Sequence, residues 1–187
     1  MQFGDLDENT AFERMYKIEP TIMDHLSQFA LSAKKRYDKG DYWWELRNCA
    51  YYDLFAKPKI IFPNLQNTNK FAFEENGVYL NAPAVFLPSN DKYLLALLNS
   101  KVVWHFLKSI CVIRSGGYIE VKPQYFEQIP IPLISEKEKK PFLALVDKII
   151  LNKSKNKDTS DLEAKIDELV YKLYDITPEE QTIIEGK

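Results

Sequence analysis

The sequence has few of the residues that build cross-linked or metal-bound scaffolds. Its 187 residues include 2 Cys, 6 Gly and 2 His. Two cysteines are too few for a disulfide scaffold, and Cys49 and Cys111 lack the close spacing of metal ligands. We expect both to be buried thiols in the reducing environment of the cytoplasm.

Long apolar runs are also missing. The longest candidate, Tyr93–Leu98, ends at Asn99-Ser100-Lys101, whereas a membrane-spanning helix needs about 20 apolar residues. Residues Met1–Asp5 have neither the basic region nor the apolar region of a signal peptide. The expectation is a soluble intracellular protein without a membrane partner.

An excess of positive charge is absent as well. The 25 Lys and Arg residues against 27 Asp and Glu give a net charge of −2, which excludes a uniformly basic coat but leaves room for a local basic face. With 45% apolar, 28% charged and 13% aromatic residues, the composition is that of an ordinary globular protein. The length fits one domain, or one domain with an appendage.

Motifs for catalysis are missing too. There is no Gly-x-Gly-x-x-Gly, phosphate-binding loop, Gly-x-Ser-x-Gly or His-Glu-x-x-His. Asn81-Ala82-Pro83 does not match the Asn/Asp-Pro-Pro-aromatic loop that grips the base in adenine methylation. The nuclease-like Asp161-x-Glu163-x-Lys165 lies at an expected helix start, where acidic residues complement the helix dipole. We therefore expect the chain alone to be no enzyme, with no catalytic or metal-binding residue.

The apolar spacing predicts a mixture of helices and short strands. After a lead-in, a helix is predicted over 20–33, and a single helix over 91–110. Apolar or alternating runs predict strands at Ile60–Phe62, Ala84–Leu87 and Tyr118–Lys122. These elements indicate a sheet flanked by helices.

Turn residues connect these strands. Asn76-Gly77 lies between the apolar runs Phe71–Phe73 and Val78–Leu80, which predicts a hairpin because both turn residues tolerate positive φ. Arg114–Gly117 predicts a second turn.

The last fifty residues are helical in pattern. Three capping boxes are expected, at Ser135 with Glu138, Ser160 with Glu163, and Thr177 with Glu180. The predicted fold is α+β, with a small mixed or antiparallel twisted sheet and packed helices, followed by a C-terminal helical hairpin. We predict one domain over residues 1–134, with the lead-in helix, the sheet and the core helix, and a hairpin appendage over 135–187.

An ordered set of motifs runs through the chain. It consists of Tyr42–Arg47, Lys57–Pro63, Leu94–Lys101, Gly116-Gly117-Tyr118 and Lys122–Pro132. In this order and spacing the motifs resemble the TaqI-like C-terminal target-recognition domain of type IIG restriction–modification enzymes and related adenine-specific DNA methyltransferases. The ending Leu162–Glu180 resembles the helical tail of those proteins.

The resemblance implies a sequence-specific DNA-recognition domain that positions a separate methyltransferase or endonuclease domain on its target. The implied partners are double-stranded DNA and the catalytic domain of a parent polypeptide. S-adenosylmethionine and Mg²⁺ are implied for that parent, and no cofactor for this chain. A second hypothesis is a docking module that uses the helical tail to bind a subunit of a restriction–modification complex.

The distribution of charge is compatible with DNA binding. Residues 54–73 contain Lys57, Lys59 and Lys70 without an acid, and residues 92–119 contain Lys92, Lys101, Lys108 and Arg114 without an acid. Such segregation suits a surface that faces phosphates, although charge runs are commonly just solvated.

Two loops are candidates for reading bases. The first contributes the polar residues Asn64, Gln66, Asn67, Asn69 and Lys70, and the second contributes Arg114, Ser115, Gly116 and Tyr118. Amides can pair with adenine and arginine with guanine, but both loops also have the composition of ordinary turns.

Three further residues outside these loops are expected to make contacts with DNA or with a neighbouring domain. Lys57 and Lys101 are predicted to contact phosphates, and Arg47 to contact DNA or a neighbouring domain. One of Trp43 and Trp44 is expected in the core.

Overall fold

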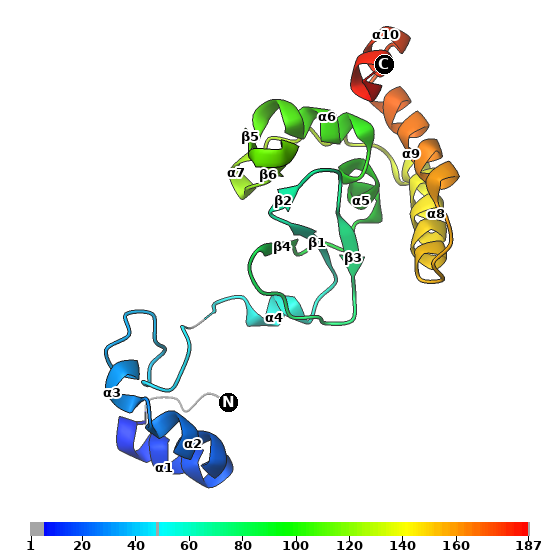
Figure 1. The fold of residues 1–187 in the computed structure, drawn as a ribbon. Helices are drawn as coiled ribbons and strands as arrows, with labels where there is room; N and C mark the ends of the chain where they lie inside the picture. Colours follow the sequence, from blue (N-terminus) through cyan, green and yellow to red (C-terminus); the bar gives the residue numbers. More distant parts are fainter. Residues whose placement is uncertain (1–5, 48, 187) are drawn as a thin grey trace. The chain divides into compact units, whose positions relative to one another are not determined.

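The computed structural model describes residues 6–47 and 49–186 and has a mixed α+β fold, as predicted (Figure 1). The chain divides into two compact units, Met1–Tyr52 and Asp53–Lys187. The first unit is helical, whereas the second combines small antiparallel sheets with helices.

The first unit begins with a helix that the apolar pattern did not predict. Its helices are α1 (Glu8–Ile18), α2 (Pro20–Ser27) and α3 (Ala30–Ala33). Asp7 caps α1 by accepting the backbone N–H groups of Asn9 and Thr10, each at 3.1 Å. The prediction of one continuous helix over 20–33 was wrong, because the chain leaves helical geometry at Phe29 (φ −106°, ψ 3°).

Aromatic side chains fill the centre of this unit. Tyr42 is buried with Ala11, and its ring stacks on Trp44 with centroids 4.9 Å apart. The Tyr42 hydroxyl donates to the Leu6 carbonyl at 2.7 Å. Trp43 is buried and Trp44 half-buried, which confirms that one tryptophan belongs to the core.

Within residues 53–186 the strands form two three-stranded antiparallel sheets. The first has the order β3-β1-β4 and contains β1 (Lys59–Pro63), β3 (Ala72–Glu74) and β4 (Ala84–Leu87). The second has the order β2-β6-β5 and contains β2 (Leu65–Gln66), β6 (Ile119–Glu120) and β5 (Val112–Ile113). A short helix, α4 (Tyr52–Phe55), precedes them. The strands expected near residues 60, 72, 85 and 119 are therefore present.

The hairpin predicted around Asn76-Gly77 is wrong. β3 pairs with β1, and residues 78–80 form no strand. Instead, the Glu74 carboxylate accepts the N–H groups of Asn76 at 2.6 Å and Val78 at 3.2 Å. The backbone after β3 is thus fixed by hydrogen bonds to the Glu74 side chain and not by pairing with a second strand.

Lys59 is the buried cation that Glu74 faces. Its ammonium group is hydrogen-bonded to the Glu74 carboxylate and also donates to the carbonyls of Phe55 at 2.7 Å and Lys57 at 3.4 Å. The hydrogen bond from Lys59 is the largest cause of the lowered pKa of Glu74, and burial opposes it. Because a lysine ammonium has three donors, all of its hydrogen-bonding capacity is used inside the protein.

The single helix predicted over 91–110 is divided in two. It consists of α5 (Lys92–Leu98) and α6 (Lys101–Ile110). Ser100 caps α6 by accepting the Val103 N–H at 3.3 Å, and the Asn99 amide donates to the Phe71 carbonyl at 2.9 Å. These polar bonds replace the helical ones at the break.

The tail contains α8 (Glu136–Lys153), α9 (Ser160–Leu173) and α10 (Pro178–Glu185). Two predicted capping boxes are confirmed, Ser135 with Glu138 and Thr177 with Glu180. The box predicted at Ser160 is wrong, because Thr159 is the N-cap residue and its hydroxyl donates to the Glu163 carboxylate at 2.7 Å.

One hydrophobic core joins the sheets, α5, α6 and the tail. The buried tail residues in it are Phe142, Val146, Ile166 and Val170. In particular, Phe142 meets the ring of Tyr93 edge-on at 5.2 Å. The tail therefore belongs to the same compact unit as the sheets, while a functional boundary at residue 134 stays a prediction.

We expect Lys59→Met to destabilise the second unit. The substitution keeps an apolar stem but removes the donor that serves Glu74 and the Phe55 carbonyl, so the free energy of unfolding should fall by about 3 kcal/mol. Urea denaturation followed by circular dichroism measures this quantity. The control is Lys57→Met at an exposed position, which should change it by less than about 0.5 kcal/mol. Equal midpoints for both variants would contradict the role of the buried pair.

Candidate functional site

The sheet β2-β6-β5 brings two polar loops together. β6 pairs with β2 through Leu65↔Glu120 and Gln66↔Ile119, and with β5 through Val112↔Glu120 and Ile113↔Ile119. The loop 64–70 contains β2, and the turn 114–118 joins β5 to β6, near the end of α6 and beside α7 (Pro123–Phe126) (Figure 1). The two loops proposed from the sequence as base readers are thus parts of one structure.

The turn 114–118 is tight and exposed. The Arg114 N–H donates to the Tyr118 carbonyl at 2.6 Å, which closes the turn. Gly116 and Gly117 both have a φ of 75°, a conformation in which residues with a side chain are strained. Ser115 and Tyr118 are exposed on this turn. The composition of the turn is therefore explained by its backbone, and its side chains remain accessible.

Arg114 is held by a carboxylate. Its Nε donates to Glu120 Oε2 at 3.0 Å, and its Nη2 donates to the same oxygen. Lys122 Nζ lies 3.3 Å from Glu120 Oε1. The hydrogen bond from Arg114 is the largest cause of the lowered pKa of Glu120, and burial opposes it. This group carries two positive charges and one negative charge.

The amides of the loop 64–70 have different roles. Gln66 is fully buried, and its Oε1 accepts the Lys70 N–H at 2.9 Å. The Asn69 amide donates to the carbonyl of Leu98, the last residue of α5, at 3.0 Å and to that of Ser100, the N-cap residue of α6, at 2.8 Å. Both side chains therefore shape and anchor the loop.

The accessible part of this loop is small. Asn67 and Lys70 are exposed, and Lys70 Nζ donates to Asn67 Oδ1 at 2.9 Å. Asn64 is half-buried, and its carbonyl accepts the Val121 N–H at 2.8 Å. Asn67 and Lys70, with Arg114, Ser115 and Tyr118 of the turn, are here called the β6 surface.

The three contact residues that were predicted outside the two loops are not part of the β6 surface. Lys57 is exposed just before β1, and Arg47 is exposed in the first compact unit. Lys101 lies at the start of α6 and forms ion pairs with Asp167 at 3.7 Å and Glu185 at 3.0 Å. In this structure Lys101 joins α6 to the tail.

Charges that are segregated along the sequence are partly neutralised in space. Four of the seven cations in the acid-free windows have carboxylate partners outside them: Lys59 with Glu74, Lys92 with Asp147, Lys101 with Asp167 and Glu185, and Arg114 with Glu120. Over the described residues, Lys57, Lys70 and Lys108 form no ion pair. The basic face is therefore smaller than the sequence predicted.

Glu120 is the residue that the sequence interpretation missed. It is the sole Asp or Glu between residues 92 and 126. In an alternating strand it shares a face with Tyr118 and Lys122. The isolated acidic residue and the alternation of the strand together would have predicted a carboxylate beside Arg114.

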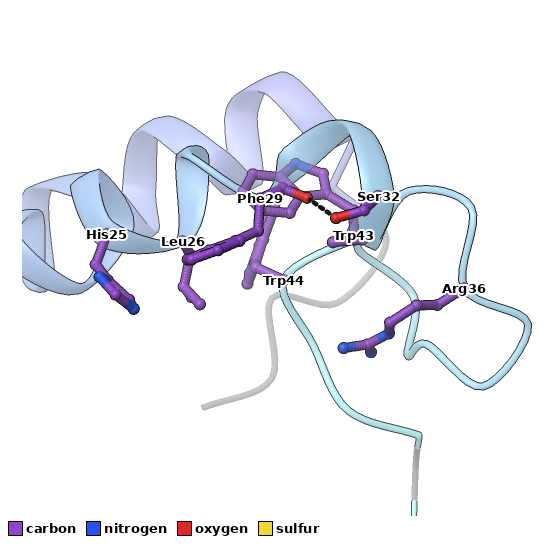
Figure 2. A pocket seen from close by; sticks show the side chains of 8 residues that line it. His25, Leu26, Phe29, Ser32, Arg36, Trp43 and Trp44 are labelled. Carbon is purple, nitrogen blue, oxygen red and sulfur yellow. Dashed lines mark hydrogen bonds between the residues drawn. The ribbon is translucent and has the colours of Figure 1, made fainter.

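A hollow of about 450 Å³ lies in the first compact unit (Figure 2). Phe29, Trp43 and Trp44 contribute to its walls. Arg36 Nε and Trp44 Nε1 are buried and have no hydrogen-bond partner among the described residues. No Asp or Glu is among the residues that line it. The hollow therefore offers hydrogen-bond donors that are not used within the described part of the chain.

Residues 6–47 and 49–186 contain no group of three or more His, Cys, Asp and Glu residues that could hold a metal ion. Over the same ranges, none of the helices has the length and apolar character that crossing a membrane requires. Cys111 is buried, as expected, whereas the expectation of a buried thiol was wrong for Cys49, which is half-buried. Burial raises the pKa of the Cys111 thiol to about 11, so this thiol stays protonated at neutral pH.

The chain was found to match a known protein family. The model of the family described as the TaqI-like C-terminal specificity domain matches residues 19–131. This range is more than half of the 187 residues. It includes the whole β6 surface and ends before the tail.

We expect Lys101→Met to loosen the tail. The substitution removes the cation that Asp167 and Glu185 share, and because the ion pairs are partly exposed the free energy of unfolding should fall by about 1 kcal/mol or less. Urea denaturation measures the change, with Lys165→Met, an exposed lysine on α9, as the control. Unchanged stability together with a lower salt dependence of DNA binding would instead assign Lys101 to a phosphate contact.

Proposed function

The chain belongs to the family of TaqI-like C-terminal specificity domains, and on that premise we propose that its β6 surface reads the sequence of double-stranded DNA. A specificity domain serves target recognition in restriction–modification enzymes and is not itself catalytic. We propose further that this chain positions a separate methyltransferase or endonuclease domain in an enzyme of type IIG. S-adenosylmethionine and Mg²⁺ belong, in this proposal, to that catalytic partner.

The carrying observation is the pairing of β6 with both β2 and β5. This pairing holds an exposed arginine, an exposed amide and a lysine on two loops that are distant in sequence. Readout of a DNA word needs several such side chains at fixed mutual positions, because each base edge presents its own pattern of donors and acceptors. A single strand with two neighbours supplies that rigidity.

The side chains of the β6 surface have complementary chemistry. Arg114 offers a planar donor fork for guanine O6 and N7, and Asn67 offers an amide for adenine. Lys70 offers a point charge for a phosphate, which fixes register without reading sequence. Lys57 and Lys108, which are exposed, would add phosphate contacts. In this mechanism the protein performs recognition only, and the partner domain performs the chemistry.

The alternative of docking through the helical tail has less support. The apolar residues Phe142, Val146, Ile166 and Val170 are buried against the core of the same unit. They therefore stabilise this chain and are not available for a partner. DNA recognition by the β6 surface is the function that the geometry favours.

Selection from a random pool of DNA duplexes tests the proposal. The 187-residue chain should enrich one short sequence word, and its affinity for that word should fall steeply as salt is raised from about 50 to about 200 mM. Arg36→Ala in the first-unit hollow is a control that should leave the enriched word unchanged. Absence of duplex binding at low salt, or binding without an enriched word, would contradict the proposal.

We expect Arg114→Ala to change the sequence preference of DNA binding and Lys57→Ala to change its overall strength. Loss of Arg114 should cost about 1–3 kcal/mol on the enriched word and relax preference at one position. Loss of Lys57 should weaken binding to every sequence and lower the salt slope by about one unit.

Competition among single-base variants at several salt concentrations measures both effects. Lys157→Ala, in the exposed linker after α8, is the matched control and should change neither quantity. If Arg114→Ala weakens every variant equally, Arg114 is a phosphate contact and does not read a base.

A further inference from the structure

Glu120 is the centre of a small charged group on β6. Its Oε2 accepts from Nε and Nη2 of Arg114, and its Oε1 faces Nζ of Lys122. The Glu120 side chain is 13% exposed, whereas those of Arg114 and Lys122 are 51% and 44% exposed. The carboxylate is thus covered by two cations whose other sides face solvent.

The pattern of hydrogen bonds leaves a defined part of Arg114 available. A guanidinium has five N–H donors, and Glu120 takes one from Nε and one from Nη2. Both donors of Nη1 and the second donor of Nη2 remain. One donor of Nη1 and the remaining donor of Nη2 point away from the side chain at the outer end of the guanidinium, and these two can form a fork with guanine O6 and N7.

Strand pairing places the Glu120 carboxylate where it can hold the Nε side of the Arg114 guanidinium. Glu120 lies in the middle strand, opposite Leu65 on one side and Val112 on the other. Arg114 comes directly after β5 and is fixed by its backbone bond to Tyr118. The backbone positions of the carboxylate and the arginine are therefore both set by the sheet, and the arginine side chain is ordered before any ligand binds.

We propose that Glu120 is a positioning residue for DNA recognition: it orients Arg114 toward guanine and limits binding to other sequences. This inference rests on the proposed function. Ordering a long side chain in advance reduces the entropy lost on binding. The negative charge also repels phosphate wherever the two cations are not correctly engaged, so it disfavours non-specific complexes.

The test is a double-mutant cycle with Glu120→Gln and Arg114→Ala in the 187-residue chain. On the enriched word, Glu120→Gln should reduce the discrimination between guanine and other bases at one position by about tenfold. It should also raise affinity for unrelated duplexes and increase the magnitude of the salt slope by about one unit. In the Arg114→Ala background, Glu120→Gln should cause no further loss of discrimination.

Three controls separate positioning from simple charge or stability effects. Glu75→Gln removes the same charge at an exposed position after β3 and should leave discrimination unchanged. Thermal unfolding of each variant shows whether the fold is retained, and Glu120→Asp should restore part of the discrimination if the carboxylate itself is required. A purely structural role would lower affinity for all duplexes together.

The outcomes separate this inference from the proposed function. If the unmodified chain enriches no word, the proposed function fails and the role of Glu120 fails with it. If Arg114→Ala relaxes one position while Glu120→Gln leaves both discrimination and non-specific binding unchanged, the function stands and the inference about Glu120 is wrong.

Discussion

Strand β6 has a partner on each side, and that double pairing determines where the polar loops lie. It is only two residues long, Ile119–Glu120, yet one residue faces the core and the other faces the charged surface. Ile119 is 2% exposed, so its burial anchors the strand by removing apolar area from water. Glu120, the next residue, is thereby directed to the opposite side. Core packing and the arrangement of the β6 surface are consequently linked through a single dipeptide.

The buried pair of Lys59 and Glu74 plays a corresponding part in the other sheet. It joins β1 to β3 at the register Lys59↔Glu74 and also holds the chain after β3 through two backbone N–H groups. Burying one charge alone would be costly, whereas a pair with every donor matched is tolerated. The first sheet is therefore held partly by polar bonds whose geometry allows little variation.

Local signals in the sequence predicted four of the strands, β1, β3, β4 and β6, but not the two-residue strands β2 and β5. They also predicted two of the capping boxes and the tight turn at Gly116-Gly117. They failed where a distant side chain decides the conformation. Asn76-Gly77 has hairpin chemistry, but Glu74 takes the N–H groups that a second strand would need. The β6 surface was predicted as two loops and not as one site, because the β2–β6 pairing joins segments far apart in sequence. The acid-free segments 54–73 and 92–119 predicted too large a basic face for the same reason, because folding brings Lys92 to Asp147 and Lys101 to Glu185 from distant parts of the chain.

The β2–β6 pairing has a consequence for redesign. The loop 64–70 rests on the end of α5 through Asn69 and on β6 through Leu65 and Gln66. If the turn 114–118 were replaced by that of a related protein, the new side chain at position 114 would face a loop 64–70 that did not come from the same protein. The β2–β6 pairing fixes how far the two loops extend relative to each other, so the two would not match. The smallest unit that can be exchanged is therefore discontinuous and consists of both loops together with Glu120. Exchange of either loop alone should give chimaeras that fold but whose two loops are not matched for binding the same DNA sequence.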